Sequence, residues 1–286
     1  MPQDQPNYKD NIGPGGRRLH PPPVRARGTP PVGPPDRPPA DWTAALTVLP
    51  GRLACSAGDF AAAWAQRPAP TPNPAGAALP PVRRRQCTWG TTAYAFGNQV
   101  SERAGPLAAA PDLVQRAVAE TIRVAPQFDV DPAGIEWFAH VNFYDTGASL
   151  QAHQDDETIH AARVDPVTQE TVQCPIFSWT FIQPPPGHPE RDYRYFVVQQ
   201  GPGNVKAPER AARTWPVPLR SGDLAVMGGT FQTDVWHGVP SAGKALAGQL
   251  RINVTVRALA RPDPAAPEPP PKRARTGDAS GQPGRV

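Results

Sequence analysis

After Asp131 the chain is a series of short segments rich in aromatic and β-branched residues, with no helical pattern between them. The segments are EWFAHVNFY, CPIFSWTFI, DYRYFVVQQ, RTWPVPL, DLAVMGG and QLRINVTVR. Glycine, proline and aspartate bound them, as is typical of strands joined by turns. Strands in series without crossover helices form double-sheet sandwiches or barrels, not parallel α/β sheets. We therefore expect a mainly β fold of the α+β class.

Two helical patterns precede these strands. DFAAAWA begins at Asp59, and PDLVQRAVAETIRVA begins at Pro111, with proline in the first turn. The apolar periodicity of the second predicts one buried stripe. Its members are Leu113, Val114, Ala117, Val118, Thr121 and Ile122. Both helices are expected to flank the β core.

The prolines are concentrated towards the ends of the chain. Twelve of the 41 lie in the first forty residues, where there is no apolar periodicity and little to bury. The segment from Pro262 onward has the same character. We expect a disordered, basic, Pro-rich arm over residues 1–41, one folded domain over residues 42–262, and a disordered tail over residues 263–286.

The basic charge lies mostly in these tails. Residues 1–41 hold six basic and four acidic side chains, and residues 262–286 hold four and three, so the tails supply three of the four net positive charges. Global charge is therefore weak evidence for nucleic-acid binding by the domain. PPKRAR, at residues 270–275, resembles a nuclear-import signal, although a solvated charge run has the same composition.

The cysteines and the hydropathy indicate an intracellular protein. Cys55, Cys87 and Cys174 are odd in number and form no CxxC pair, so neither a disulfide framework nor a zinc knuckle is indicated. No apolar run is long enough to span a bilayer, and MPQDQPNYKD is too polar for a signal peptide. We expect a monomer without a membrane partner, in the nucleus or the cytoplasm.

HQDDETIH, from His153 to His160, crowds two histidines and three carboxylates into eight residues. Imidazole and carboxylate ligands suit zinc, manganese and non-haem iron alike. A third ligand can come from far along the chain, because strands distant in sequence meet in a β-roll, and His237 follows the strand pattern GDLAVMGG. Two histidines with Asp155 would leave three coordination positions open, which favours Fe(II) with a chelating co-substrate.

The other histidines are not expected to bind metal. His20 and His188 lie in Pro-rich segments, and His140 lies in an alternating strand, where a core or surface position is more common. A strand-end histidine such as His237 is also more often structural, so its assignment depends on the residues that accompany it.

The strand RINVTVR carries polar side chains at even spacing. Arg251, Asn253 and Arg257 therefore point to one face. An arginine offers a fixed, always charged fork to a carboxylate. An outward charged edge, with Val254 and Val256 inward, fits the same pattern, and the strand alone leaves both arrangements open.

Together these elements resemble the AlkB family of Fe(II)/2-oxoglutarate-dependent dioxygenases. The matching segments are NFY at Asn142, HQDDE at His153, PIFSWTF at Pro175, SGDLAVMGG at Ser221, WHGVP at Trp236 and RINVTVR at Arg251. They occur in family order over about residues 80–258. The resemblance implies a double-stranded β-helix (jelly-roll) core.

The resemblance also implies roles for individual residues. His153, Asp155 and His237 would hold iron. The implied 2-oxoglutarate contacts are Arg251, to the distal carboxylate, Asn142 and Tyr144, and, near the metal-chelating end, Asn253 and Arg257.

VRRRQCTWGTTAYAF, over residues 82–96, resembles the stretch by which nucleic-acid repair members contact the substrate strand. It implies the repair-type branch. The implied substrate contacts are Arg83, Arg84 and Arg85 to phosphates, Trp89 and Tyr94 to a base, and Asp156 and Glu157 to the methylated base. Alternatively, the aromatic residues pack on the core, the arginines form a solvated run, and the two carboxylates are solvated or bind the backbone.

The implied activity is oxidative demethylation of N-alkylated bases, of the 1-methyladenine and 3-methylcytosine type, in single-stranded DNA or RNA. It would use Fe(II), 2-oxoglutarate and O₂ and release formaldehyde, succinate and CO₂. A base inside a duplex must be flipped out, and PTPNPAGAALPPV holds no apolar wedge to fill the gap, which favours single strands. Two alternatives stay open, a hydroxylase or demethylase of protein side chains and a non-catalytic nucleic-acid-binding module.

Overall fold

The computed structural model describes residues 45–70, 84–90, 95–96, 99–100, 102–133, 135–146, 148–155, 162–164, 171–199, 214–229, 231–241 and 246–259. The whole Pro-rich arm, the whole tail with PPKRAR, and the segment searched for an apolar wedge, apart from its first residue, lie outside these residues.

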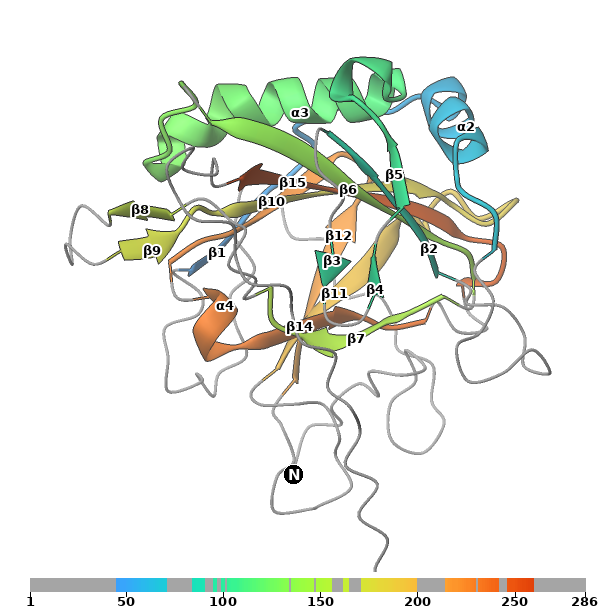
Figure 1. Ribbon diagram of the computed structural model, residues 1–286. Coiled ribbons are helices and arrows are strands. Elements are labelled where there is room, and N and C mark those ends of the chain that lie inside the picture. The colour runs from blue at the N-terminus through green and yellow to red at the C-terminus, as the bar shows by residue number, and fades with distance from the viewer. Residues whose placement is uncertain are drawn as a thin grey trace, which may run out of the picture.

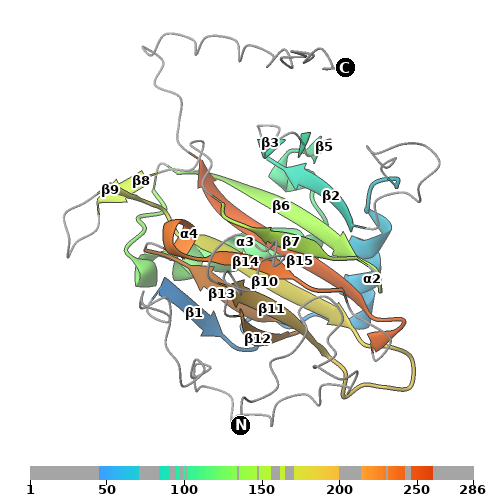
Figure 2. The same cartoon turned by 90° about the horizontal axis from the view of Figure 1, so that it is seen from below.

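The larger sheet has seven strands in the order β1-β13-β10-β15-β6-β2-β5. They are β1 (Leu46–Leu49), β2 (Arg84–Trp89), β5 (Glu102–Gly105), β6 (Glu136–Tyr144), β10 (Ile176–Gln183), β13 (Asp223–Met227) and β15 (Leu250–Leu259). Neighbours pair antiparallel except β2 with β5. The last strand of the chain therefore lies in the middle of the sheet, between β10 and β6 (Figure 2).

The smaller sheet has four strands in the order β12-β11-β14-β7 and faces the larger one (Figure 1). They are β7 (Leu150–His153), β11 (Tyr193–Gln199), β12 (Thr214–Arg220) and β14 (Trp236–Val239). Two short pairs lie apart from both sheets, β3 (Ala95–Phe96) with β4 (Gln99–Val100), and β8 (Ala162–Val164) with β9 (Thr171–Gln173). Two facing, mostly antiparallel sheets confirm the mainly β, jelly-roll prediction.

Helices α2 (Ala57–Ala65) and α3 (Asp112–Val124) cover the outer face of the larger sheet (Figure 1). The shorter helices are η1 (Leu107–Ala109), η2 (Ala125–Phe128) and α4 (Phe231–Asp234). Within the described ranges, every helix is too short or too polar to cross a bilayer.

The buried stripe of α3 is as predicted except at one residue. Ile122 is 37% exposed, whereas Val124 is fully buried. Val124 returns to the buried face three residues after Thr121, whereas Ile122 lies at the edge of that face, towards solvent. Including Ile122 in the stripe was therefore wrong.

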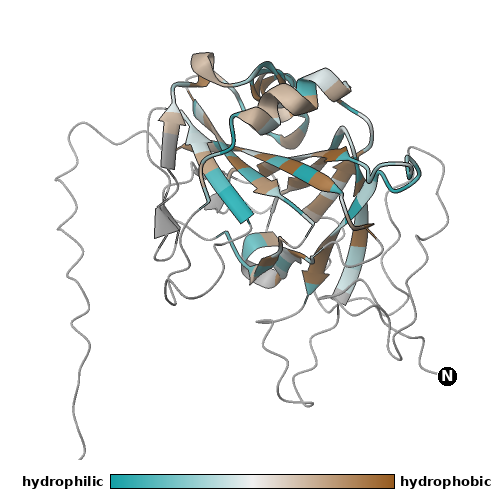
Figure 3. Ribbon diagram, turned by 90° about the vertical axis from the view of Figure 1, so that its right-hand side faces the viewer, coloured by the Kyte–Doolittle hydropathy of each residue, from teal (hydrophilic) through white to brown (hydrophobic). Residues whose placement is uncertain are grey.

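Alternation along the strands gives the larger sheet two different faces, visible as brown and teal bands in Figure 3. One set of alternate side chains packs against α2 and α3, and it includes Trp89, Trp179, Ile252, Val254 and Val256. The other set faces the interior between the two sheets. The helices thus decide between the two arrangements of β15 that the sequence left open. They cover its valines, so its polar residues face the interior between the sheets.

The interior between the sheets is apolar at one end and polar at the other. At the apolar end, Ile176, Ala225 and Met227 of the larger sheet pack against Phe196 and Val198 of the smaller one. At the other end, the inward residues of β2, β6 and β15 are mostly polar. A polar interior at one end of a closed roll is suited to a binding site.

A chain of residues 42–262 is expected to fold and to turn over 2-oxoglutarate normally. All helices and strands of the described part of the chain lie between Leu46 and Leu259. Circular dichroism and succinate formation, compared with the full chain, test this. Loss of folding would show that the domain boundaries are misplaced, whereas loss of oligonucleotide binding alone would assign the basic arm a tethering role.

Candidate metal centre

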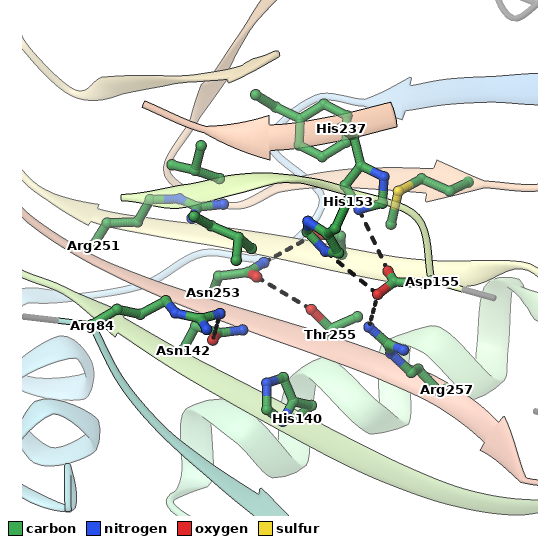
Figure 4. Close-up of a pocket in the computed structure, with 15 residues that line it drawn as sticks. Arg84, His140, Asn142, His153, Asp155, His237, Arg251, Asn253, Thr255 and Arg257 are labelled. Atoms are coloured by element: carbon green, nitrogen blue, oxygen red, sulfur yellow. Dashed lines mark hydrogen bonds and ion pairs between the residues drawn. The ribbon is translucent and has the colours of Figure 1, made fainter. Parts of the chain in front are cut away.

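Three side chains from β7, β14 and the residues after β7 converge on one point between the sheets (Figure 4). The backbones of His153 and His237 are paired, and their ring centroids are 4.4 Å apart. The Nε2 atoms of the two rings each lie 3.5 Å from a different carboxylate oxygen of Asp155. One candidate ligand atom from each residue lies within 4.8 Å of the others, so one metal ion can contact all three.

Neighbouring groups hold two of these side chains in the orientation that a metal requires. His153 Nδ1 lies 2.9 Å from the carbonyl oxygen of Gln151, so an Nδ1–H donates there and Nε2 faces the cluster. The backbone N–H of Asp155 donates to Gln232 Oε1 in α4 at 2.9 Å. Phe196 stacks on the His237 ring with centroids 5.3 Å apart.

The surroundings hold Asp155 and His237 in the protonation states that bind a metal. Arg257 Nη2 lies 3.0 Å from Asp155 Oδ1, and both side chains are buried. Burial acts to raise the pKa of Asp155, but the charge of Arg257 and the hydrogen bonds from both histidines hold that pKa well below its usual range. Burial, then the charge of His153, lowers the pKa of His237 to about 4. An ionised carboxylate and a neutral imidazole are the forms that bind a divalent metal.

A cavity that opens to solvent adjoins the three side chains. Its floor is the polar face of β2, β6 and β15, where cross-strand pairing places residues in rows. The rows are Arg84–Tyr144–Arg251, Gln86–Asn142–Asn253 and Thr88–His140–Thr255. The arginine row lies at one end of the floor, and the next polar position of β15 beyond the last row is Arg257, which contacts Asp155.

Arg251 fits the carboxylate of an acidic co-substrate. Its side chain is buried and lies over the Tyr144 ring, with 4.9 Å between Cζ and the ring centroid. Nη2 donates to Thr180 Oγ1 at 3.1 Å, but Nε and Nη1, like the Tyr144 hydroxyl, have no hydrogen-bond partner among the described residues. Buried donors without a partner are costly. The site therefore suits an anion delivered by a ligand, and 2-oxoglutarate meets that requirement.

The remaining predicted co-substrate residues line the same cavity but make contacts within the protein. Asn142 Oδ1 accepts from Arg84 Nη1 at 3.1 Å. Asn253 Nδ2 donates to Ser178 Oγ at 2.9 Å and to the Trp179 carbonyl at 2.8 Å. Both amide hydrogens of Asn253 are therefore in use, and its Oδ1 accepts from Thr255 Oγ1 at 3.2 Å, so in this structure Asn253 has no donor to offer a co-substrate that carries only acceptors.

Trp89 and Arg84 do not lie where a substrate contact was expected. Trp89 is 6% exposed and packs in the core beneath the helices, on the face of β2 opposite the cavity, so it is not available to stack on a base. Arg84 lies on the cavity face, bonded to Asn142, and not on a surface that a phosphate backbone would follow. Arg85, on the other face, donates to the Pro68 carbonyl at 3.4 Å. Arg83, Tyr94, Asp156 and Glu157 lie outside the described residues.

His140 is a polar cavity residue that the sequence analysis did not assign to the site. His140 is buried, lines the cavity, and lies 3.4 Å from Thr88 Oγ1 through Nδ1. Burial, then the charges of Arg257 and Arg84, lowers its pKa to about 3, so the ring is neutral. The signal was present, because His140 is two residues before Asn142 and must share its face of β6.

A family model described as the 2OG-Fe(II) oxygenase superfamily matches residues 57–257, a range that includes the three convergent side chains and Arg251. A solved structure titled "The structure of OsALKBH1" is similar to the chain with a TM-score of 0.40 and 17% sequence identity, over 74% of this chain and 96% of that one. No curated protein matches the sequence.

Proposed function

The chain belongs to the 2OG-Fe(II) oxygenase superfamily, and from this premise we propose that it is an AlkB-type oxidative demethylase of N-alkylated bases in single-stranded DNA or RNA. It is a dioxygenase whose cofactors are Fe(II), 2-oxoglutarate and O₂. The observation that carries the proposal is the convergence of His153, Asp155 and His237 beside the partnerless donors of Arg251 in one open cavity. For the nucleic-acid substrate, the support is the resemblance of the RRRQCTWG stretch to that of repair enzymes.

The protein residues prepare the site for a reaction that the cofactors perform. Bound iron, with 2-oxoglutarate and O₂, would supply the oxidation that converts an N-methyl group to a hydroxymethyl group, which is lost as formaldehyde. Arg257 keeps Asp155 ionised, and the Gln151 carbonyl keeps Nε2 of His153 directed at the metal position. Arg251 offers Nε and Nη1 to the distal carboxylate. Holding the reactants in this geometry is the protein's part of the catalysis.

The cavity requires an extrahelical base. It is open to solvent, and its floor lies inside the roll, so a stacked and paired base cannot reach the metal position. Arg84 reaches this cavity from β2, the strand that resembles the substrate-contacting stretch of repair members. Its guanidinium is therefore a candidate contact for the entering nucleotide.

Mass spectrometry of methylated oligonucleotides, after incubation with the protein, Fe(II), 2-oxoglutarate and O₂, tests the proposal. Loss of one methyl group from single-stranded substrates, with matching amounts of succinate and formaldehyde, is the expected result. A parallel panel of methylated Lys and Arg peptides is the comparison. Turnover of peptides with oligonucleotides unchanged would refute the base-demethylase proposal and favour a protein-modifying enzyme.

Bases that carry a positive charge are expected to react fastest. Methylation at the ring nitrogen of adenine or cytosine leaves the base cationic near neutral pH, whereas methylation of the exocyclic amine leaves it neutral. A carboxylate ~4 Å from the cation contributes up to about 4 kcal/mol at an effective dielectric constant of 20, and its desolvation offsets part of this. We expect 1-methyladenine and 3-methylcytosine to be preferred over exocyclic N-methyladenine by about one to two orders of magnitude.

Glu157→Gln tests which carboxylate senses this charge. The variant should erode the preference while it spares 2-oxoglutarate turnover in the absence of a base. Competition between 1-methyladenine and exocyclic N-methyladenine in one oligonucleotide mixture measures the ratio directly. Equal rates on both bases in the wild-type protein would refute the electrostatic explanation but leave the iron chemistry intact.

A further inference from the structure

Besides Arg251 and Arg257, a further buried guanidinium lies on the inner face of the smaller sheet. Arg194, in β11, is 0% exposed. Alternation along β11 places it on the same face as Phe196, which lines the cavity, and Val198, whose backbone pairs with that of His237. The cavity contacts described above do not use this arginine.

The Arg194 side chain joins three segments that lead into or out of the site strands. Nε and Nη2 donate to the Pro240 carbonyl at 3.1 and 2.8 Å, and Nη2 also donates to the Ala148 carbonyl at 2.8 Å. Nη1 donates to Gln249 Oε1 at 3.3 Å. Pro240 follows β14, Ala148 precedes β7, and Gln249 directly precedes β15. These are the strands that carry His237, His153 and Arg251.

Gln249 links the same three segments to β11 and the residues just before it. Its side chain is fully buried, and Nε2 donates to the carbonyls of Arg191 and Tyr193, both at 2.9 Å. The polar groups that Arg194 and Gln249 meet are thus backbone carbonyls and each other. Their positions fix the start of β15, where Arg251 is the second residue.

Arg194 also adds a positive charge near that of Arg251. Burial, then the neighbouring positive charge of Arg251, lowers the pKa of Arg194 to about 9, so it remains a cation at neutral pH. Tyr144 and Asp145 act in the opposite direction. In the described parts of the chain neither arginine forms a salt bridge. Two buried cations that repel each other are stabilised when an anion binds between or beside them.

We propose that Arg194 is a positioning residue for the distal carboxylate of 2-oxoglutarate. It fixes the Ala148 and Pro240 carbonyls, and thereby Ala148 and Val239, which pack with Tyr144, the residue whose ring lies beneath the Arg251 guanidinium. It also adds a second positive charge near that of Arg251. The inference rests on the assignment of Arg251 to the co-substrate and does not depend on which substrate is oxidised.

Calorimetric titration of the full chain, with Mn(II) in place of iron and without nucleic acid, tests this role. The two titrants are 2-oxoglutarate and 2-oxobutyrate, which lacks the distal carboxylate. Arg194→Met should raise the Kd for 2-oxoglutarate by about tenfold or more, and leave the Kd values for 2-oxobutyrate and Mn(II) within about twofold of wild type. Arg194→Lys keeps the charge but loses the planar fork, so an intermediate loss of about three- to tenfold is expected.

Leu113→Ala is the control for a general loss of stability. Leu113 is buried in α3, on the far side of the larger sheet, and its truncation should lower Tm without changing the Kd for 2-oxoglutarate. The proposal is overturned if Arg194→Met leaves 2-oxoglutarate affinity unchanged, if it weakens both acids equally, or if Leu113→Ala has the same effect. Where Arg194→Met does not fold, wild-type affinity in Arg194→Lys overturns it.

The same titration separates this inference from the assignments it rests on. Arg251→Ala, measured in parallel, should lose more affinity for 2-oxoglutarate than either Arg194 variant. If Arg251→Ala binds 2-oxoglutarate with wild-type affinity, the assignment of Arg251 to the co-substrate is wrong, and the inference about Arg194 falls with it. If the protein binds 2-oxoglutarate as expected but demethylates no base, only the proposed substrate fails.

Discussion

His237→Ala is expected to abolish 2-oxoglutarate-dependent formaldehyde release, and His153→Ala should do the same. Each change removes one of only three protein ligands from the candidate centre. Mutations of groups that merely orient a metal ligand typically cost 10- to 100-fold, so loss of a direct ligand should exceed about 100-fold. Formaldehyde release and Mn(II) binding by calorimetry are the two measurements, and both should fall together.

His188→Ala is the matched control for these variants. His188 lies in an exposed loop near Glu190, far in sequence from the three ligands. It should keep wild-type activity and metal affinity. Full Mn(II) affinity in both His153→Ala and His237→Ala would show that the metal binds elsewhere.

Arg251→Ala should raise the 2-oxoglutarate requirement by tens to thousands of fold. Truncating one partner of a buried, bidentate charge pair costs about 2 to 5 kcal/mol in binding, because the other charge is left buried and unpaired. Nε and Nη1 of Arg251, which have no partner in the part of the chain that the structure describes, are the structural reason for expecting the upper part of that range. The KM for 2-oxoglutarate, and its Kd in the presence of Mn(II), measure the effect.

Arg116→Ala serves as the control for removal of an arginine. Arg116 forms ion pairs with Asp59 and Asp112 at the surface of α3, on the helical side of the larger sheet. Its loss should leave both constants unchanged. If Arg251→Ala also retains wild-type affinity, another group binds the distal carboxylate.

The spacing of residues along single strands allowed much of the site to be predicted. Arg251, Asn253 and Arg257 share a face because side chains alternate along a strand, and their common face does line the cavity. Which face was inward could not be decided from β15 alone. It depends on α2 and α3, which lie more than 100 residues earlier in the chain and bury Val254 and Val256.

The assignment of substrate contacts shows where reasoning from a single strand fails. Trp89 was assigned to a base because aromatic faces accept any base, but β2 adds to the larger sheet with Trp89 on the helical side. A strand of six residues at one side of a sheet carries no internal signal of which face meets the core. The pairing of Arg84 with Tyr144 settles it, and that pairing is a tertiary fact.

Arg194 illustrates what sequence patterns cannot reveal. Its carbonyl partners lie 46 residues away in both directions, and Gln249 lies 55 residues away. Within β11, Arg194 interrupts a run of aromatic and apolar side chains. By itself this pattern indicates an edge strand, or a wrongly assigned strand register. Only the closure of the roll brings the three segments around its guanidinium.

A crystal structure of the full chain with Mn(II) and 2-oxoglutarate tests the central claim most directly. The predicted result is one metal ion ~2.0–2.2 Å from His153 Nε2, an Asp155 carboxylate oxygen and His237 Nε2, with the distal carboxylate of 2-oxoglutarate on Arg251. The claim is contradicted if the metal binds away from these three side chains, or if the co-substrate is anchored elsewhere while Arg251 stays without an anion.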